Sequence, residues 1–204
     1  MRISKDVVTF SIVGAGARST NYVKALVQRY SGKFKIVAIA EPNAQKREAF
    51  VKQFDIPLEN VFEDYREFNK KDRLSDVVII GTLDDMHYEP AVSALEKGYD
   101  LILEKPISMN LKETIAVGDV ASKYPNQMVA VCHVLRHSPF FSKLKEIVGT
   151  KELGNIVDIQ HTENIGYYHF AHSYVRGNWR NTDIAAPISV AKTCHDFDLL
   201  LYLL

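Results

Sequence analysis

A lysine between a glutamate and a proline is the first feature of this chain with clear chemical potential. Glu104 and Lys105 directly follow a short apolar run. A positively charged ring beside a lysine lowers the pKa of its ammonium toward the range that suits proton transfer. Lys105 is therefore a candidate for exchanging a proton with a substrate hydroxyl, and a surface ion pair is the structural alternative. Because the next residue is Pro106, the peptide bond between Lys105 and Pro106 could be cis.

A second candidate for proton transfer is His195, near the C-terminal end of the sequence. Lys192 and His195 are three residues apart and share one face of a predicted helix. Asp198 has the same spacing from His195, so its carboxylate is a candidate for fixing the imidazole tautomer. No HExxH pattern and no paired cysteines accompany these residues, and we expect no metal site.

The sequence at positions 14–19, Gly-Ala-Gly-Ala-Arg-Ser, has the pattern of a phosphate-binding loop. An apolar run precedes it and a helical pattern follows, as a dinucleotide site requires. Gly14 permits the tight turn, and Gly16 lets the backbone approach a pyrophosphate at the helix N-terminus. Ser19 replaces the usual third glycine; it is small enough for helix packing and able to donate a hydrogen bond to phosphate. Arg18 adds a charge-assisted contact or points to solvent, and a plain strand-to-helix turn is the alternative for the loop. The predicted cofactor-binding residues of the loop are Gly14, Gly16, Ala17, Arg18 and Ser19.

An acidic residue after the second apolar run predicts which dinucleotide is bound. Glu41 lies near the separation from the glycine loop at which a carboxylate accepts hydrogen bonds from an adenosine ribose. Such a carboxylate repels the additional phosphate of NADP, so NAD is the expected cofactor, although Lys46 or Arg47 would partly offset the charge by swinging inward. The alternative is that Glu41 caps the helix that follows Pro42.

Two further polar residues follow the fourth predicted strand. Thr82 and His87 come at the carboxyl edge of a parallel sheet, where ligands settle in doubly wound folds. Together with Glu104 and Lys105 they are candidates for cofactor contacts. Helix capping is an equally open interpretation for His87, since acidic residues at positions 84–85 also suit the start of a helix.

Alternating strand and helix patterns position these residues. They predict an α/β fold, a Rossmann-type doubly wound parallel sheet, in a dinucleotide-binding domain of residues 1–126. The predicted strands span residues 10–13, 36–40, 77–80, 100–103 and 128–132. The predicted helices span residues 44–54, 65–69, 89–97 and 111–123, after a first helical pattern with Tyr22, Leu26 and Val27.

Residues 127–204 are expected to form the beginning of an α+β domain for substrate binding and dimerisation. A helix is predicted at 139–148, an alternating strand at 155–164 and an apolar helix at 192–204, with a loop at 166–188 that covers a site. The last helix has no glycine, proline or polar cap to end it, so we expect a truncated piece of a longer protein. Several polar residues could line a pocket, although isolated His and Arg are usually packing or surface residues. These residues are His133, Arg136, His137, His169, His172, Trp179 and Arg180. The predicted substrate-binding residues are Lys105, Arg136, Trp179, Arg180, Lys192 and His195.

The composition narrows the classes of partner. The chain is 47% hydrophobic, and its Lys plus Arg and Asp plus Glu totals are both 25, so no net field favours nucleic acid or an anionic membrane. It has no apolar run of about 18 residues that would span a membrane. Cys132 and Cys194 are the two cysteines, which argues against a disulfide framework and favours a reducing, cytoplasmic location. Residues 1–17 share features with a secretion signal, but a strand and phosphate loop account for them more fully.

Taken together, the residues resemble the Gfo/Idh/MocA family of oxidoreductases, which includes glucose-fructose oxidoreductase and inositol dehydrogenase. The resemblance covers essentially the whole chain. It rests on residues 14–18, 40–43, 86–91, 95–98 and, above all, 104–107.

The resemblance implies roles for individual residues. Lys105 would serve both cofactor and substrate, and His195 would exchange the hydroxyl proton. Many members place Asp or Asn four residues before that histidine, where this chain has Ala191. Similar sequences with a Lys-x-x-His-Asp-x-Asp arrangement imply that Lys192 takes over this place. Family members also carry a large open sheet for substrate binding and subunit pairing, which implies a homo-oligomer.

The expected function is that of an NAD-dependent dehydrogenase acting on a hydroxyl carbon of a sugar, polyol or derivative. One alternative is an NAD-dependent glycosidase that oxidises its sugar transiently and gives no net NADH. A second is a non-catalytic protein that uses the dinucleotide domain as a sensor or partner-binding module, which the Ala191 replacement favours. A small-molecule substrate, and neither nucleic acid nor membrane, is the expected partner.

Overall fold

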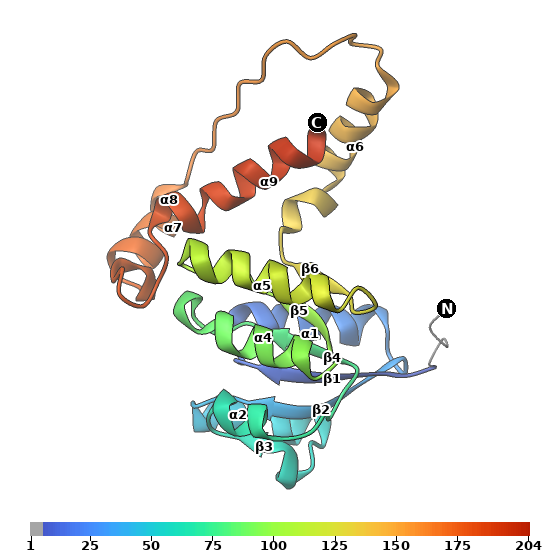
Figure 1. Cartoon of the computed structure of the whole chain (residues 1–204). Helices are drawn as coiled ribbons and strands as arrows, with labels where there is room; N and C mark the ends of the chain where they lie inside the picture. The colour runs from blue at the N-terminus through green and yellow to red at the C-terminus, as the bar shows by residue number, and fades with distance from the viewer. Residues whose placement is uncertain (1–5) are drawn as a thin grey trace. The chain divides into compact units, whose positions relative to one another are not determined.

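The computed structural model describes residues 6–204 (Figure 1). Contacts divide the chain into two compact units, Met1–Val131 and Cys132–Leu204. The last strand of the first unit ends directly before this division. The division into a dinucleotide-binding domain of residues 1–126 and a substrate domain of residues 127–204 stays a prediction.

A six-stranded sheet forms the centre of the first unit, with the order β3-β2-β1-β4-β5-β6. All neighbouring strands pair in parallel, and the chain winds outward from β1 in both directions, as a doubly wound fold does. The sequence pattern missed β3, because two residues are too few to show a period. The strands are β1 (Val8–Val13), β2 (Phe34–Ala40), β3 (Val61–Phe62), β4 (Val77–Ile80), β5 (Asp100–Leu103) and β6 (Val129–Val131).

Helices flank this sheet close to where the sequence predicts them. Asn43, Asp64 and Asn110 cap the helices that follow them, each accepting a hydrogen bond from a backbone N–H of the first turn. Short 3₁₀ turns occupy Leu58–Asn60 and Asp84–Met86. The helices are α1 (Ala17–Arg29), α2 (Ala44–Phe54), α3 (Tyr65–Lys70), α4 (Tyr88–Glu96) and α5 (Leu111–Lys123).

The sheet is buried on both faces. Successive residues of β4 alternate between two apolar layers: Ile79 packs with Val23 of α1 and Phe50 of α2, whereas Ile80 packs in the layer that contains residues of α3, α4 and α5. This burial explains why the central strands read as continuous apolar runs. The rigid sheet then fixes the loops that leave the carboxyl ends of its strands.

The second unit is helical. Its helices are α6 (Pro139–Thr150), α7 (Tyr167–Phe170), α8 (Ile188–Ala191) and α9 (Thr193–Leu203). Ser138 caps α6 by accepting a hydrogen bond from the N–H of Phe141 at 3.3 Å. The predicted loop of residues 166–188 contains α7, a π-helical turn at Ala171–Val175 and a 3₁₀ turn at Asn178–Arg180.

The predicted strand at 155–164 is wrong. These residues follow α6 as an extended trace (Figure 1) that pairs with no strand among residues 6–204. Alternating side chains alone do not make a strand, because its backbone groups need a partner. In the described part of the chain, no helix has the length and apolar character needed to cross a membrane.

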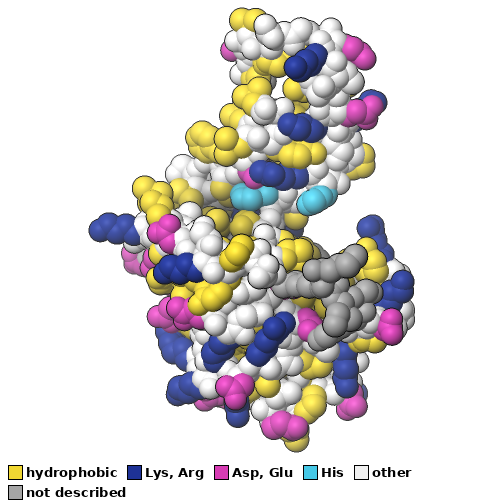
Figure 2. Space-filling model, turned by 45° about the vertical axis from the view of Figure 1, so that its right-hand side comes forward, with side chains coloured by type: hydrophobic (Ala, Val, Ile, Leu, Met, Phe, Trp, Pro, Cys, Tyr) yellow, Lys and Arg dark blue, Asp and Glu magenta, His cyan; other side chains and the backbone are white. Residues whose placement is uncertain are grey.

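Charged side chains of both signs are interspersed over the face shown in Figure 2, in line with the equal totals of 25. Cys132 and Cys194 are not joined by a disulfide bond.

Candidate cofactor and catalytic site

The glycine loop joins β1 to α1. Gly14 has a φ of +83°, and a Cβ there would lie 2.8 Å from the carbonyl oxygen of Gly81 and the amide nitrogen of Thr82. Only glycine suits this conformation and this close approach. Gly16 is the N-cap of α1 and makes no side-chain cap, so the first N–H groups of the helix form the kind of site that binds a phosphate. Ala17 and Arg18 are exposed on this first turn.

Ser19 stands where a third glycine is usual, and Gly81 makes room for it. The Ser19 side chain is fully buried, and a Cβ on Gly81 would overlap its Oγ. Among the described residues, Ser19 Oγ has no hydrogen-bond partner. Gly81 is not among the predicted site residues, although a glycine directly after an apolar strand is a signal for a close approach.

Glu41 is held against the glycine loop. Its side chain is only 6% exposed. Its Oε2 accepts a hydrogen bond from the N–H of Ala15 at 2.6 Å, and its Oε1 accepts one from the N–H of Asn43 at 2.9 Å. Asn43, and not Glu41, caps α2. Each carboxylate oxygen has a further lone pair, so Glu41 keeps the capacity to accept hydrogen bonds from ribose hydroxyls.

Arg47 contacts the backbone carbonyl of Glu41 and not its carboxylate. Its Nη1 donates to the Glu41 carbonyl at 2.6 Å and to the Pro42 carbonyl at 3.2 Å. Its Nη2 donates to Glu63 at 2.8 Å. The guanidinium is therefore engaged by protein groups, and Lys46 is exposed.

The loop that carries Lys105 leaves the end of β5. Glu104 is buried; its Oε1 accepts a hydrogen bond from the Tyr22 hydroxyl of α1, and its Oε2 accepts one from the Lys105 N–H at 3.1 Å. The peptide bond between Lys105 and Pro106 is cis, the option that the sequence left open. Glu104 thus ties the lysine loop to the helix of the glycine loop.

His87 lies at the start of α4 and contacts the same loop. It is 1% exposed, and its Nδ1 lies 2.7 Å from the Pro106 carbonyl oxygen. Its side chain makes no helix-capping hydrogen bond. Thr82 is nearby in sequence, and its hydroxyl donates to the Met86 carbonyl at 3.0 Å.

These loops share one edge of the sheet. They follow β1, β2, β4 and β5, which are neighbours in the order β2-β1-β4-β5, and all four strands are parallel. Their carboxyl ends meet at one edge, where ligands bind in doubly wound folds. The structure therefore brings most of the predicted residues of the first unit to a single place. The residues at this edge are Gly14, Gly16, Ala17, Arg18, Ser19, Glu41, Thr82, His87, Glu104 and Lys105.

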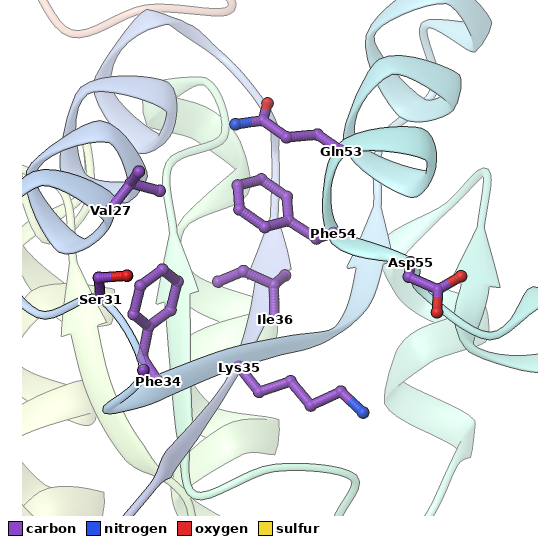
Figure 3. A pocket seen from close by; sticks show the side chains of 9 residues that line it. Val27, Ser31, Phe34, Lys35, Ile36, Gln53, Phe54 and Asp55 are labelled. Atoms are coloured by element: carbon purple, nitrogen blue, oxygen red, sulfur yellow. The ribbon is translucent and has the colours of Figure 1, made fainter.

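A separate pocket of about 380 Å³ lies at the other end of β2 (Figure 3). Phe34, Ile36 and Phe54 form its apolar walls, and Lys35 and Asp55 also line it. Phe34 and Lys35 begin β2, so this pocket is at the amino end of the strand and not at the edge that carries Glu41.

In the second unit, Arg136 and Asp198 form a bidentate ion pair. Arg136 Nε donates to Oδ2 at 2.7 Å and Nη2 donates to Oδ1 at 2.6 Å. The hydrogen bonds to Asp198 raise the pKa of Arg136. Both carboxylate oxygens of Asp198 accept hydrogen bonds from Arg136. The expectation that Asp198 fixes the His195 tautomer stays a prediction.

His195 lies in a group of polar residues on and around α9. Its ring meets the His133 ring edge to face, with centroids 5.7 Å apart. Asp196, the next residue, pairs with His161 Nε2 at 2.7 Å. Desolvation and the nearby Asp196 charge raise the pKa of the Glu163 carboxyl, against a smaller opposing effect of Lys192.

Sequence reasoning missed His161 and Glu163. The signal was the spacing of His161 and Glu163, because residues two apart in an extended segment lie on one side. Trp179 and Arg180 lie in the 3₁₀ turn of residues 178–180, and their assignment to substrate stays a prediction. In residues 6–204, no group of three or more His, Cys, Asp or Glu is arranged to hold a metal ion.

Comparisons with known proteins identify the family. A family model described as an oxidoreductase family with an NAD-binding Rossmann fold matches residues 8–153. The chain belongs to the Gfo/Idh/MocA family of oxidoreductases. The predicted family, fold class and NAD cofactor are thereby confirmed.

Several curated relatives are dehydrogenases. The chain is 27% identical over 197 residues to inositol 2-dehydrogenase of Corynebacterium glutamicum, covering 94% of this chain and 52% of that protein. It is 25% identical over 147 residues to trans-1,2-dihydrobenzene-1,2-diol dehydrogenase of Xenopus tropicalis, covering 72% and 43%. The chain thus spans about half the length of the curated relatives that it matches.

Solved structures agree on the fold. The WlbA dehydrogenase of Bordetella pertussis, in complex with NADH and UDP-GlcNAcA, has a TM-score of 0.79 at 18% identity, covering 99% of this chain and 58% of that one. A NAD-binding protein of Listeria innocua has a TM-score of 0.71 at 26% identity, covering 98% and 55%.

Proposed function

We propose that this protein is an NAD-dependent dehydrogenase that acts on a hydroxyl carbon of a sugar, a polyol or a derivative of one. The observation that carries the proposal is the convergence of the glycine loop, Glu41 and Lys105 at the carboxyl edge of one parallel sheet. The names of relatives, inositol 2-dehydrogenase and a dihydrodiol dehydrogenase, support a hydroxyl-bearing substrate.

The residues at this edge fit a dinucleotide. The close approach at Gly14 and Gly16 leaves backbone, and no side chain, at the start of α1, where the N–H groups suit a pyrophosphate. The Glu41 carboxylate suits the two hydroxyls of an adenosine ribose and repels the extra phosphate of NADP. NAD, when bound, supplies the nicotinamide ring that accepts a hydride from the substrate carbon.

Two residues of the chain would handle the substrate proton. Either Lys105, at the end of β5, or His195 would take the proton of the substrate hydroxyl as the carbon loses hydride. Many family members have Asp or Asn where this chain has Ala191, and Lys192 would take over the role of that residue. Trp179 and Arg180 would contact the substrate. Arg136, which is paired with Asp198, would also contact it.

The cellular setting completes the proposal. We place the protein in the cytoplasm, because Cys132 and Cys194 are not joined by a disulfide bond and so suit a reducing compartment. We also propose a homo-oligomer, because the extended residues 155–164 have exposed apolar side chains, such as Val157 at 96%, and no partner strand in residues 6–204. The proposed partner is a small sugar or polyol and no nucleic acid.

Replacement of Lys105 tests the catalytic assignment. Inositols, other polyols and sugars are offered with NAD, and NADH absorbance is followed for the unaltered chain, Lys105→Met and the exposed control Lys112→Met. We expect Lys105→Met to lower turnover by about 100-fold or more, the typical share of a proton-transfer group, with little change in NADH affinity. Equal turnover of Lys105→Met and Lys112→Met would refute the role of Lys105.

A further inference from the structure

The contact between His87 and Pro106 gives the buried histidine a defined function. His87 is 1% exposed, and its Nδ1 is 2.7 Å from the Pro106 carbonyl oxygen. A carbonyl oxygen can only accept a hydrogen bond, so Nδ1 must carry the proton. Pro106 is itself buried, which removes water as a competing donor for its carbonyl.

Lys105 is therefore anchored on both sides. On one side, the Tyr22 hydroxyl holds the Glu104 carboxylate, which also accepts the Lys105 N–H at 3.1 Å. On the other side, His87 holds the carbonyl of the residue that follows Lys105. The anchors come from α1 and from the start of α4, so two elements on opposite faces of the sheet fix one short loop.

We propose that His87 is a positioning residue: its Nδ1–H holds the Pro106 carbonyl and thereby aims Lys105 at the nicotinamide site. The proposal rests on the role of Lys105 in the proposed function. It differs from a direct cofactor contact of His87, because the effect passes through the backbone of the lysine loop. Misplacement of a reacting group by about 1 Å can cost about 100-fold in rate, so such an anchor has a large effect.

The side-chain chemistry of asparagine and glutamine gives a matched pair of variants. The Asn amide can place a donor where His87 has Nδ1, whereas the Gln amide reaches the place of Nε2. We therefore expect His87→Asn to keep the hydrogen bond to Pro106, and His87→Gln and His87→Ala to lose it. Exposed His137, replaced by Asn and by Gln, serves as the control.

The reactivity of the Lys105 amine is measured by competitive acetylation with acetic anhydride, read by mass spectrometry, with and without NADH. NADH is chosen because its dihydronicotinamide ring is uncharged, so a change in rate reports shielding. At NADH of about ten times Kd, we expect about tenfold protection of Lys105 in the unaltered chain and in His87→Asn, since only the free chain is labelled. In His87→Gln and His87→Ala we expect protection to fall below about twofold, with each variant kept at the same multiple of its own Kd from NADH fluorescence.

The outcomes distinguish the positioning role of His87 from the role of Lys105 itself. Protection that persists in His87→Gln and His87→Ala would overturn the positioning role and leave the role of Lys105 intact. No protection in the unaltered chain, with NADH bound, would overturn the placement of Lys105 in the proposed function and the positioning role with it.

A second measurement needs no substitution. Two-bond ¹H–¹⁵N correlation spectra report which imidazole nitrogen of each histidine carries the proton. We expect His87 in the unaltered chain to carry it on Nδ1, and a proton on Nε2 alone would overturn the proposal even if the variants do not fold.

Discussion

Replacement of Gly81 by alanine should destabilise the first unit, although glycine-to-alanine changes usually stabilise. A Cβ on Gly81 would overlap Ser19 Oγ. The next nearest atoms, Ser19 Cβ at 3.5 Å and the Gly14 carbonyl oxygen at 3.6 Å, are at ordinary contact distances. The added Cβ would therefore clash only with the Ser19 hydroxyl. The Ser19 side chain is fully buried and has little room to move.

The expected loss in the free energy of unfolding follows from the cost of overpacking. Extra atoms in a tightly packed site cost about 1 to 3 kcal/mol. A loss of about 2 kcal/mol lowers the Tm of a unit of this size by about 5 to 10 °C. Ser19→Ala removes the Oγ and leaves the 3.5 Å contact, so the double variant Ser19→Ala/Gly81→Ala should be about as stable as Ser19→Ala alone. The coupling free energy between the two sites should then equal the loss caused by Gly81→Ala.

Differential scanning calorimetry and urea denaturation measure these effects. Gly118→Ala is the matched control, because Gly118 is exposed in α5 and a Cβ there meets no atom within 4 Å. That change should raise stability by about 0.5 to 1 kcal/mol. Equal stability of Gly81→Ala and the unaltered chain, or no recovery in the double variant, would refute the pairing of Ser19 with Gly81.

Three further predictions concern charged and ionisable groups. Glu41→Gln should reduce the preference for NADH over NADPH in fluorescence titrations, because it removes the repelling charge; an unchanged ratio would contradict this. Arg136→Ala should destabilise the second unit by about 2 kcal/mol in urea denaturation, because Asp198 keeps its charge at 11% side-chain exposure; a change below about 0.5 kcal/mol would argue against the ion pair. Desolvation and the hydrogen bond to Glu89 raise the pKa of Tyr65 to about 12. Unfolded tyrosine ionises first, so stability should fall as the pH rises from about 10 to 12, and Tyr65→Phe should reduce that loss; identical alkaline profiles would refute it.

The sequence predicts the first unit well because its signals are local. The continuous apolar run of β4 is set by neighbouring residues. The two residues of β3 gave no such signal. The glycine loop, Glu41 and Lys105 were found because each directly follows a strand, and parallel strands bring their carboxyl ends together.

Contacts between distant residues could not be predicted in the same way. The partners Ser19 and Gly81 are recognised only when the loops after β1 and β4 are placed side by side. Helix spacing gave no sign that Asp198 binds Arg136, 62 positions away in the sequence. His161 and Asp196 pair across 35 positions. Such pairs depend on tertiary packing, which spacing within one segment does not report.

We expect the edge formed by the glycine loop and Glu41 to bind NAD. Calorimetric titration of the chain with NADH and, separately, with NADPH tests it most directly. We predict saturable binding of NADH, with weaker binding of NADPH because of the Glu41 carboxylate. A chain that is folded by circular dichroism and binds neither dinucleotide would contradict the account.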